Sequence, residues 1–489
     1  MTEHSSPAPS LRARAALLVL AALAAVSGAR PQSTPLDVGT KRQIFIDRRF
    51  IADSKGVELV VERPRLTGER LLVPDRPWED YWIGGYTTVV QDGDRVQMWY
   101  EVASKQDRDG STGVAYATSK DGGATWTKPD LGVISFNGST RNNLVLSGIH
   151  GMHVAQNRPD APAAERFILY AGKPNRAYVS PDGIRWTPSG KEAFLDRKAH
   201  KHMTLDSQNV VFWDTRLRKY VIYARFNLPT DRGTARVLRV FRRAESATFG
   251  DFGKFDTVFA PDDRDPIDFD WYTTAAIEYP FAADAYFMWP AAYHHTPPPP
   301  KNDGPLDLQF ACSRDGIQWL RPDRSPVIPL GPDGGWDSGS LYAGYGLTRH
   351  GNELALYYTA YDLTHGGYVK RDNLGGVVTR ARYRLDGFTS LTAGYEGGEF
   401  TTPPLRFSGD QLELNFDGSA GGWCRVEVRD GDGKPVAGFT EQDADKISGN
   451  SVATPVSWRG SRSLSRLQGK PVSLRFVMRD AKLFAFQFR

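Results

Sequence analysis

The sequence predicts an all-β protein, with a five-bladed β-propeller over residues 36–394 followed by a C-terminal β-sandwich over residues 395–489. Two observations carry this prediction. Strand-favouring aromatic residues are abundant (12 Trp, 20 Tyr and 25 Phe), whereas patterns of helical period are scarce after the first 30 residues. A unit of strand, polar turn, aromatic strand and hairpin also recurs five times, beginning near residues 80, 150, 203, 270 and 336.

The spacing of these units fits blades of four antiparallel strands. Successive units begin roughly 50 to 70 residues apart, and a blade takes about 40 to 50 residues before loops are added. A ring of blades needs a closing strand, because an open ring leaves an unpaired edge. We expect the early strand RQIFIDRRFI (42–51) to pair with a terminal blade and close the ring.

A short motif returns in three of the units, as SKDGGATW (119–126), SPDGIRW (180–186) and SRDGIQW (313–319). In each copy the Asp can accept hydrogen bonds from backbone N–H groups, the Gly permits a positive φ, and the Trp can bury a large ring between blades. The motif resembles the Asp-box of sialidases, which is a structural turn in a propeller. It therefore indicates construction and not catalysis, and we expect it after the third strand of a blade.

From about residue 395 the pattern changes to short alternating strands separated by turns. Examples are QLELNFDG, CRVEVRD and VSLRFVMRDAKLFAFQF. Alternation of this kind is typical of a β-sandwich. A structural role for this domain is favoured, and a carbohydrate-binding module is the alternative.

The N-terminus has the pattern of a secretory signal peptide, residues 1–29. Arg12 and Arg14 precede the apolar run 15–26, which ends in the small residues 27–29. The run is shorter than the ~20 apolar residues of a spanning helix, so a membrane anchor is the lesser alternative. We expect a secreted or periplasmic protein without stable membrane insertion.

Charge and metal-ligand patterns narrow the function classes. The net charge of +4 is spread along the chain without a basic block, which argues against a nucleic-acid partner. Cys312 and Cys424 fall in different expected domains, so no disulfide between them is expected. The segment DGDGKP (430–435) lacks the sixth-position Gly of a calcium loop and predicts a hairpin turn. We expect no cofactor, and only a cation on the propeller axis stays open.

Candidate functional residues lie where the first strand of each blade begins, because these strand ends rim the central channel of a propeller. Hydrolysis of a glycosidic bond needs one carboxyl group as acid and a second as base or nucleophile. Aromatic rings can stack on the apolar faces of sugars. The candidate catalytic residues are Glu79, Asp80, Asp206, Asp270 and Asp337. The candidate substrate-binding residues are Trp82, His153, His202, Asn209, Arg225, Trp271, Tyr272, Tyr293, His294 and His365.

Asp206 and Asp270 are the strongest of these candidates. Both stand at the start of a first strand, in separate blades, so we expect both to project into one axial pocket. A carboxyl group crowded by like charges and aromatic surface has a raised pKa, which suits a general acid. Its partner, paired with His202 or Arg225, would stay ionised as base or nucleophile.

The number of blades, the first-strand acids and the trailing domain resemble the five-bladed propeller glycoside hydrolases of families 32, 43, 68 and 117. The segments LDSQNVVFWD, DWYTTAA, YYTAYDLTHG and RARYRLDGFTSL are most similar to secreted bacterial family-32-like proteins. The resemblance covers nearly all of residues 36–489. It implies exo-acting cleavage or transfer of glycosyl units in oligo- or polysaccharides by acids from separate blades.

The sequence departs from the family pattern at several points. No NDPNG-type nucleophile motif is present in the first unit. The RDP at 264–266 and Glu278 fall around a single blade start, which makes that match a coincidence. Where the second blade of the family carries an acid, this chain has His153 and Gln156. The family mechanism is therefore not carried over intact.

Three function classes follow from the sequence. A secreted glycoside hydrolase is favoured by the acids and aromatic residues at the blade starts. A catalytically inactive carbohydrate-binding propeller is the alternative, because family motifs are missing. A propeller that binds proteins is the third class, and the same acids and aromatic residues count against it.

Overall fold

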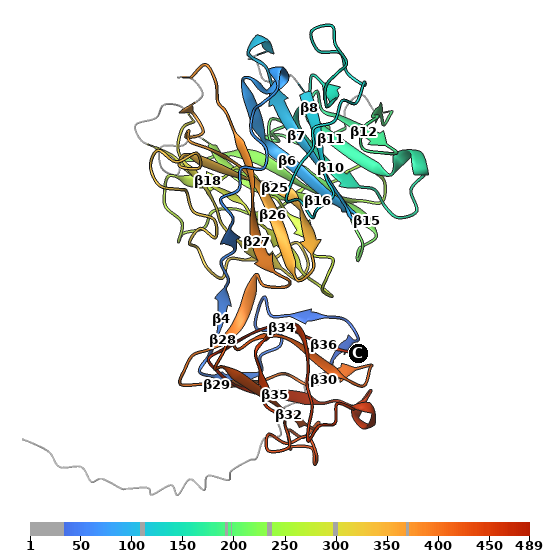
Figure 1. Cartoon of the computed structure of the whole chain (residues 1–489), viewed down its shortest axis with the longest axis vertical. Coiled ribbons are helices and arrows are strands. Elements are labelled where there is room, and N and C mark those ends of the chain that lie inside the picture. Colours follow the sequence, from blue (N-terminus) through green and yellow to red (C-terminus); the bar gives the residue numbers. More distant parts are fainter. Residues whose placement is uncertain are drawn as a thin grey trace, which may run out of the picture. The chain divides into compact units, whose positions relative to one another are not determined.

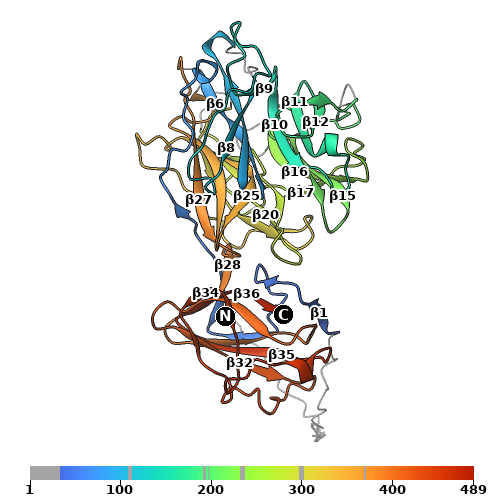
Figure 2. The same ribbon diagram turned by 45° about the vertical axis from the view of Figure 1, so that its right-hand side comes forward.

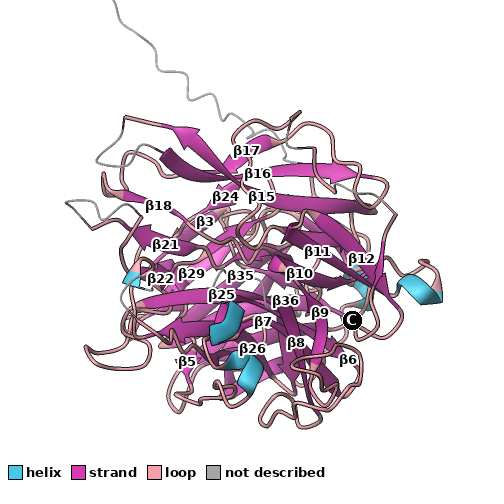
Figure 3. Cartoon of the chain, turned by 90° about the horizontal axis from the view of Figure 1, so that it is seen from above, coloured by secondary structure: helices cyan, strands magenta, loops and turns pink. Residues whose placement is uncertain are grey.

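The computed structural model describes residues 34–107, 113–190, 194–196, 198–231, 237–296, 302–367 and 371–489. Strands dominate this part of the chain, which contains no α-helix, so the all-β prediction is confirmed (Figure 3). Short 3-10 turns include η1 (Pro77–Glu79), η2 (Lys105–Asp107), η3 (Ala163–Glu165) and η5 (Ser465–Leu467). No helix in these ranges is long and apolar enough to span a membrane. The expected signal peptide, residues 1–29, lies outside the described residues.

Five groups of antiparallel strands follow one another along the chain, and we number them group 1 to group 5 (Figure 1). Group 1 contains β6 (Trp82–Asp92), β7 (Arg95–Ala103), β8 (Gly113–Ser119) and β9 (Leu144–Ser147). Group 2 contains β10 (His150–Gln156), β11 (Phe167–Lys173), β12 (Arg176–Ser180) and β13 (Thr187–Pro188). Group 3 contains β14 (Val210–Asp214), β15 (Lys219–Pro229), β16 (Val237–Ser246) and β17 (Asp256–Phe259).

Group 4 has the same order, but its first three strands are each broken in two. The first position holds β18 (Phe269–Trp271) and β19 (Ile277–Glu278), and the second holds β20 (Tyr286–Met288) and β21 (Ala291–His294). The third position holds β22 (Leu306–Leu308) and β23 (Ala311–Ser313), and β24 (Trp319–Leu320) is the last strand. The halves β18-β21-β22 and β19-β20-β23-β24 are hydrogen-bonded separately.

The outer strand of group 5 comes from the N-terminal part of the chain. Group 5 contains β25 (Ser340–His350), β26 (Glu353–Tyr361), β27 (Val377–Arg384) and β5 (Arg65–Leu66). In the register, Leu66 lies opposite Ala381. An early strand thus joins the last group, but the prediction that residues 42–51 do this is wrong. Within that range, β2 (Gln43–Ile44) pairs instead with β36 (Ala481–Phe488) in the C-terminal sheets.

The C-terminal strands form two larger sheets and one parallel pair. One sheet has the order β34-β31-β36-β28-β4, and the other has the order β3-β29-β35-β32-β33. Their strands are β3 (Asp53–Lys55), β4 (Val57–Val61), β28 (Thr389–Ala393), β29 (Gly398–Thr401), β31 (Leu412–Asp417), β32 (Trp423–Arg429), β33 (Ile447–Ser448), β34 (Asn450–Pro455) and β35 (Ser473–Arg479). β1 (Leu36–Gly39) pairs in parallel with β30 (Leu405–Phe407). Figure 2 shows β32, β34, β35 and β36 gathered together.

These pairings differ from the expected domain boundaries of 36–394 and 395–489. The early strands β1 to β4 and the strand β28 pair with C-terminal strands and not with the five groups. Figure 1 shows the blue strand β4 beside the orange strand β28. Apolar side chains from both sheets, including Leu414 and Phe476, share one buried cluster. Burial of this shared face explains why residues 36–61 join the C-terminal strands.

Each of the three repeated motifs, which we call box turns, follows the third strand of its group. Residues 119–126, 180–186 and 313–319 begin at the ends of β8, β12 and β23. Asp121 Oδ1 accepts hydrogen bonds from the backbone N–H groups of Ala124 (3.0 Å) and Thr125 (2.9 Å). The indole N–H of Trp126 donates to the carbonyl of Gly123 (3.1 Å). The predicted position and the turn chemistry are both confirmed.

Each box turn packs against the second strand of the preceding group. A Cβ atom at Gly183 would lie 2.4 Å from the Trp99 ring on β7, whose indole N–H donates to the Gly183 carbonyl (2.6 Å). A Cβ atom at Gly123 would lie 1.9 Å from the Tyr357 hydroxyl on β26. The box turn of group 4 meets β15 of group 3 in the same way. For group 1, the preceding group is therefore group 5.

Candidate functional site

A cavity of about 410 Å³ lies at the strand ends where each group begins. Its aromatic lining residues are Tyr81, Trp82, Tyr86, Tyr272, Tyr342 and Tyr361. Its charged and polar lining residues are His150, Lys173, Asp206, Asn302, Ser340, Thr364 and His365, and Gly85, Leu363 and Leu374 complete it. Strands of groups 1, 2 and 5, together with residues that flank the first strands of groups 3 and 4, contribute to this single wall.

The start of β6 is shaped by two glycines. The pairing of β6 with β7 shifts register between Ile83 and Thr87. A Cβ atom at Gly85 would lie 2.8 Å from the ring of Tyr342, and one at Gly84 would lie 2.7 Å from the ring of Trp82. Glycine is required here because aromatic rings approach the backbone too closely for any side chain. The sequence WIGGY therefore allows Trp82 and the ring of Tyr342 to pack at the cavity wall.

Asp206 is the carboxylate of the cavity wall. Its Oδ1 accepts a hydrogen bond from Nη2 of Arg225 (2.5 Å), and its side chain is 51% exposed. Arg225 is buried and is also held by Thr204 and the ring of Tyr272, whose centroid lies 4.6 Å from the guanidinium carbon. Burial works against ionisation of Asp206, but the positive charges of Arg225 and Lys173 outweigh it and lower the pKa of the carboxyl group. Asp206 is therefore an ionised group that a ligand can reach.

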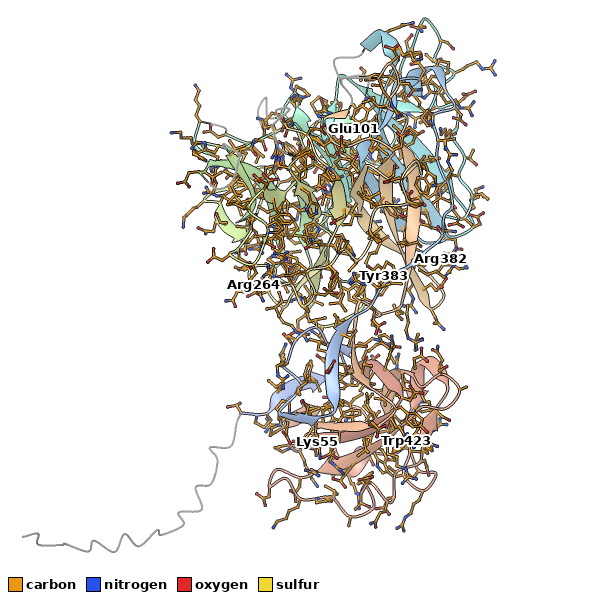
Figure 4. All side chains as sticks on the ribbon, turned by 90° about the vertical axis from the view of Figure 1, so that its left-hand side faces the viewer. Lys55, Glu101, Arg264, Arg382, Tyr383 and Trp423 are labelled. Carbon is orange, nitrogen blue, oxygen red and sulfur yellow. The ribbon has the colours of Figure 1, made fainter. Side chains whose placement is uncertain are left out.

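His150 and Glu101 form a second polar pair. Nδ1 of His150 lies 3.0 Å from Oε2 of Glu101, and Oε1 of Glu101 accepts from the backbone N–H of Met152 (2.7 Å). Burial opposes the charged form of His150, but Glu101 outweighs it and raises the pKa of the imidazole. Because Glu101 occupies Nδ1, Nε2 is the ring nitrogen that a ligand in the cavity can reach. Figure 4 shows Glu101 at the opposite end of the strand groups from Tyr383.

Aromatic rings and a neutral histidine form another part of the cavity wall. The hydroxyl of Tyr342 and Nδ1 of His365 are 2.8 Å apart, and the rings of His365 and Tyr272 have centroids 4.4 Å apart. Burial and the positive charges of Arg239 and Arg225 lower the pKa of His365 to about 3. His365 is therefore uncharged at neutral pH and supplies a polar edge to the aromatic surface.

Asp270 does not line the cavity, in contrast to Asp206. Its side chain is only 1% exposed, and its Oδ2 lies 2.9 Å from Nη1 of Arg239 and 3.2 Å from Nε2 of His295. The expectation that Asp206 and Asp270 project into one pocket therefore fails for Asp270. The physical reason is the buried guanidinium of Arg239 on β16, which needs a paired carboxylate. Asp270 therefore lies behind the cavity wall: it pairs with Arg239, and the guanidinium of Arg239 packs against the ring of the lining residue Tyr272.

The other three candidate acids lie away from the cavity lining. Glu79 is buried and bonds Lys128 (2.7 Å) and the hydroxyl of Tyr100 (2.8 Å); burial raises the pKa of its carboxyl group despite Lys128. Asp80 accepts from the backbone N–H of Lys105 (2.7 Å). Asp337 stands in the loop before β25, half-buried, and a Cβ atom on Gly331 would meet its carboxylate. None of these three carboxylates belongs to the cavity wall.

The ten candidate binding residues divide into three sets. Trp82, Tyr272 and His365 line the cavity. Arg225, Asn209 and Tyr293 support it from behind: Asn209 accepts from the backbone N–H of Arg225 (2.9 Å), and the ring of Tyr293 lies 5.8 Å from that of Tyr272. The remaining four, which are not among the lining residues, are His153, His202, Trp271 and His294.

The residues of this last set have other surroundings. His153 is buried and bonds the carbonyl of Val211 (2.8 Å), and burial lowers the pKa of its imidazole to about 3. Trp271 is buried beneath the guanidinium of Arg321. His294 lies 3.0 Å from Asp307, and His202 is exposed in a turn with φ 71°. His153 and Trp271 are therefore core residues, whereas His294 is partly exposed and His202 lies at the surface.

Sequence reasoning missed Glu101, Lys173, Tyr342 and Tyr361. Glu101, Lys173 and Tyr361 lie near the ends of second strands, which return antiparallel to the edge where the first strands begin. The signal was present in the sequence: Glu101 is a lone acid in the apolar run VQMWYEVA, and Lys173 ends the run FILYAG.

The described residues hold no set of three or more His, Cys, Asp or Glu side chains that could bind a metal ion. Cys312 and Cys424 are buried free thiols, and burial raises the pKa of both. The candidate site is therefore described by its organic side chains alone.

Comparison with known proteins gives likeness at the level of solved structures. No family model matches the chain, and no curated protein matches it. One similar structure is a family 43 arabinoxylan arabinofuranohydrolase from Bacillus subtilis in complex with cellotetraose (12% identity, 84% of this chain and 97% of that chain, TM-score 0.40). A second is from the GH130 family of mannoside phosphorylases, described as containing glycoside hydrolases that target beta-1,2 mannosidic linkages in Candida mannan (14%, 70% and 97%, TM-score 0.44).

A third similar structure is the exo-inulinase of Aspergillus awamori (10% identity, 85% of this chain and 99% of that chain, TM-score 0.40). These three solved structures are of propeller-type glycoside hydrolase families, the class that the sequence resemblance names.

Proposed function

We propose that the chain is an exported glycoside hydrolase that removes sugar units from the ends of oligo- or polysaccharides. One observation carries the proposal. The ionised carboxylate of Asp206 and the imidazole of His150, which Glu101 holds toward its charged form, line the same cavity of about 410 Å³. Six aromatic side chains line the same cavity, and such surfaces bind the apolar faces of sugar rings.

The proposal includes a five-bladed propeller, with the cavity at one mouth of its axis, and a C-terminal β-sandwich. The neighbour relations of the groups support a ring. β6 packs beside β10, β10 beside β14, β16 beside β18, β22 beside β25, and β25 again beside β6. The box turn of group 1 packs against group 5, which closes the same cycle. The sandwich is supported by the apolar cluster shared between the two C-terminal sheets.

Asp206 serves as base or nucleophile in this mechanism. Its low pKa, maintained by Arg225 against the effect of burial, keeps the group ionised at neutral pH. An ionised carboxylate can activate a water molecule or attack the anomeric carbon, but it cannot donate a proton. The general acid must therefore be another group, and the described residues place no carboxylic acid with a raised pKa on the cavity wall.

His150 takes the role of general acid. Its charged form is stabilised by Glu101, and Nε2 can deliver a proton to the leaving glycosidic oxygen. Glu101 bonds Nδ1 and so fixes the ring orientation without touching the substrate. With Asp206 as nucleophile, the neutral imidazole takes a proton from the water that hydrolyses the bond between Asp206 and the sugar, which restores both groups. With Asp206 as base, the proton of the attacking water goes to Asp206, and both groups return to their starting state by proton exchange with solvent.

The size of the cavity favours action at chain ends. Its volume is toward the small end of the ~300 to 1,000 Å³ typical of ligand pockets. A pocket of that size with aromatic lining residues fits a terminal sugar better than an internal segment of a long chain.

A catalytically inactive carbohydrate-binding protein is the second candidate. One observation favours it: among the described residues, Asp206 is the sole carboxylate that lines the cavity, and it is engaged by Arg225. Such a protein would bind glycans through the same aromatic wall without cleaving them.

Hydrolysis of an oligosaccharide panel by the full chain separates the two candidates. We expect release of single sugars, which is lost in Asp206→Asn and in His150→Gln but retained in the matched control Asp94→Asn, an exposed residue of the β6–β7 turn. Glycan binding by all four proteins is measured in parallel. Binding without hydrolysis by the unmodified chain would support the second candidate and contradict the first.

A further inference from the structure

The charged side chains that line the cavity have ion-pair partners, with one exception. Asp206 pairs with Arg225, Glu101 with His150, and Asp270 with Arg239. The exception is Lys173, which lines the cavity, is exposed, and has no ion-pair partner among the described residues. One positive charge at the wall is thus available to a ligand.

Lys173 stands beside the proposed general acid. It is the last residue of β11, and the register places it directly opposite His150 on β10. Directly opposed residues of antiparallel strands have Cβ atoms about 5 Å apart, so both side chains serve the same part of the cavity. A group bound by Lys173 therefore belongs to the same sugar as the bond under attack or to its immediate neighbour.

Two buried hydrogen-bond donors add to this positive charge. Nε1 of Trp82 and Nη1 of Arg225 have no hydrogen-bond partner within the part of the chain that is described. Trp82 lines the cavity, and Arg225 lies behind Asp206 and is 4% exposed. Buried donors are normally satisfied, because an unmade hydrogen bond is costly. Acceptor oxygens of a ligand are the natural partners of such donors.

The nearby negative charge does not cancel Lys173. Asp303 follows the lining residue Asn302, but its Oδ1 accepts from the backbone N–H groups of Gly304 (2.7 Å) and Gly366 (2.7 Å). It is not among the residues that line the cavity. The one carboxylate among the described lining residues, Asp206, lies near two cations, since Arg225 pairs with it and Lys173 also lowers its pKa.

We propose that the cavity selects an acidic sugar, one that carries a carboxylate as uronic acids do, with Lys173 as the residue that recognises the charge. The inference rests on the proposed function and names the substrate class of the same site. A neutral sugar offers Lys173 no charged partner, whereas a carboxylate accepts a charge-assisted hydrogen bond from its ammonium group. The aromatic wall stacks on the ring of the same sugar.

Binding of single sugars to the full chain tests the inference without requiring hydrolysis. The probes are glucuronic and galacturonic acid, their neutral counterparts glucose and galactose, and glucose 6-sulfate, titrated by calorimetry. We expect at least one uronic acid to bind about 10-fold or more tightly than its neutral counterpart, since a charge-assisted hydrogen bond contributes about that much. The preference should weaken as salt is added.

Variants of Lys173 identify the residue responsible. Lys173→Met should reduce the preference for the uronic acid to within about 3-fold while leaving neutral-sugar affinity unchanged, and Lys173→Arg should keep most of it. Equal affinity for acidic and neutral sugars would overturn the inference, as would tight binding of the sulfate alone. Equal loss of both sugar types in Lys173→Met would also overturn it. Failure of hydrolysis with the preference intact would contradict only the proposed enzymatic activity.

Discussion

The box turns and the cavity wall both place aspartates near strand ends, yet they use them differently. Asp121, Asp182 and Asp315 each bond two backbone N–H groups of their own turn. Asp206 instead pairs with an arginine from another strand and is half exposed to the cavity. The first arrangement recurs three times, although Asp121 bonds residues three and four positions on and the other two aspartates bond residues two and three positions on. The second is found, among the described residues, only in the carboxylate that lines the cavity. In a protein built from repeats, an arrangement that recurs serves the fold, whereas an arrangement that occurs once is the better candidate for a catalytic role.

The largest expected effect lies at the cavity. Asp206→Asn preserves shape but removes the charge, so we expect turnover to fall about 10³-fold or more, with little change in unfolding free energy. Asp270→Asn should behave in the opposite way, because it leaves the buried Arg239 without a counter-charge. Steady-state kinetics and urea unfolding of both variants measure the contrast. A stability loss without a loss of turnover for Asp206→Asn would break it.

A second test concerns the packing of a box turn against the neighbouring strand group. Gly183→Ala brings a methyl group to 2.4 Å from Trp99, whereas Gly93→Ala, at a similar positive φ (76° against 61°), meets no atom within 4 Å. Both variants carry the backbone cost of about 1 to 2 kcal/mol. Overpacking should add about 1 to 3 kcal/mol for Gly183→Ala alone. Urea unfolding measures the difference, and equal stabilities would contradict the packing of box turns on neighbouring groups.

A third test follows the proton of His150. Glu101 raises the pKa of His150, so the acid form, and with it activity, is lost as the pH rises through that value. Glu101→Gln removes the charge, so the alkaline limb of kcat/KM should move to lower pH. The pH profile of the variant against that of the unmodified chain measures this shift. An unchanged alkaline limb would assign the proton to another group.

The smallest effect is expected within a box turn itself. Hydrogen bonds from Thr125 are the largest of the interactions that lower the pKa of Asp121. The ionised carboxylate therefore stabilises the fold at pH values above its pKa in the unfolded chain. This stabilisation is lost as the pH falls through the pKa of the group in the folded protein. Asp121→Asn should cost less than about 1.5 kcal/mol, because the group is solvent-screened. Thermal unfolding between pH 7 and pH 2 should show the difference shrinking in acid. Loss of turnover in a stable Asp121→Asn protein would contradict the structural role of the turn.

Local pattern explains what the sequence predicted well. Alternating apolar strands, aromatic second strands and the Asp and Gly of the box turns carry their signal within a few residues, and the structure has strands and turns at those positions. Asp206, Trp82, Tyr272 and His365 were found because they flank first strands or their neighbours. Their roles in catalysis and binding stay predictions.

Long-range pairing explains what the sequence did not predict. Nothing near Arg65 indicates that its partner is Arg382, and nothing near Val57 indicates Ala393. The burial of Asp270 likewise depends on Arg239, a residue of another strand group. Glu101 and Lys173 reach the cavity only because second strands fold back antiparallel to the first. Such facts belong to the tertiary structure, since no local propensity encodes them.

The pairing of β5 with β27 has a consequence for synthesis on the ribosome. Leu66 leaves the exit tunnel far ahead of its partner Ala381. At about 5 to 20 residues per second, the wait is roughly 15 to 60 s. During translation the early strands are exposed edges, which are prone to aggregate and are natural targets for chaperones. A chain that ends before residue 377 lacks β27 and therefore leaves β5 unpaired. This exposed strand edge distinguishes a truncated product from the finished protein as a target for proteolysis.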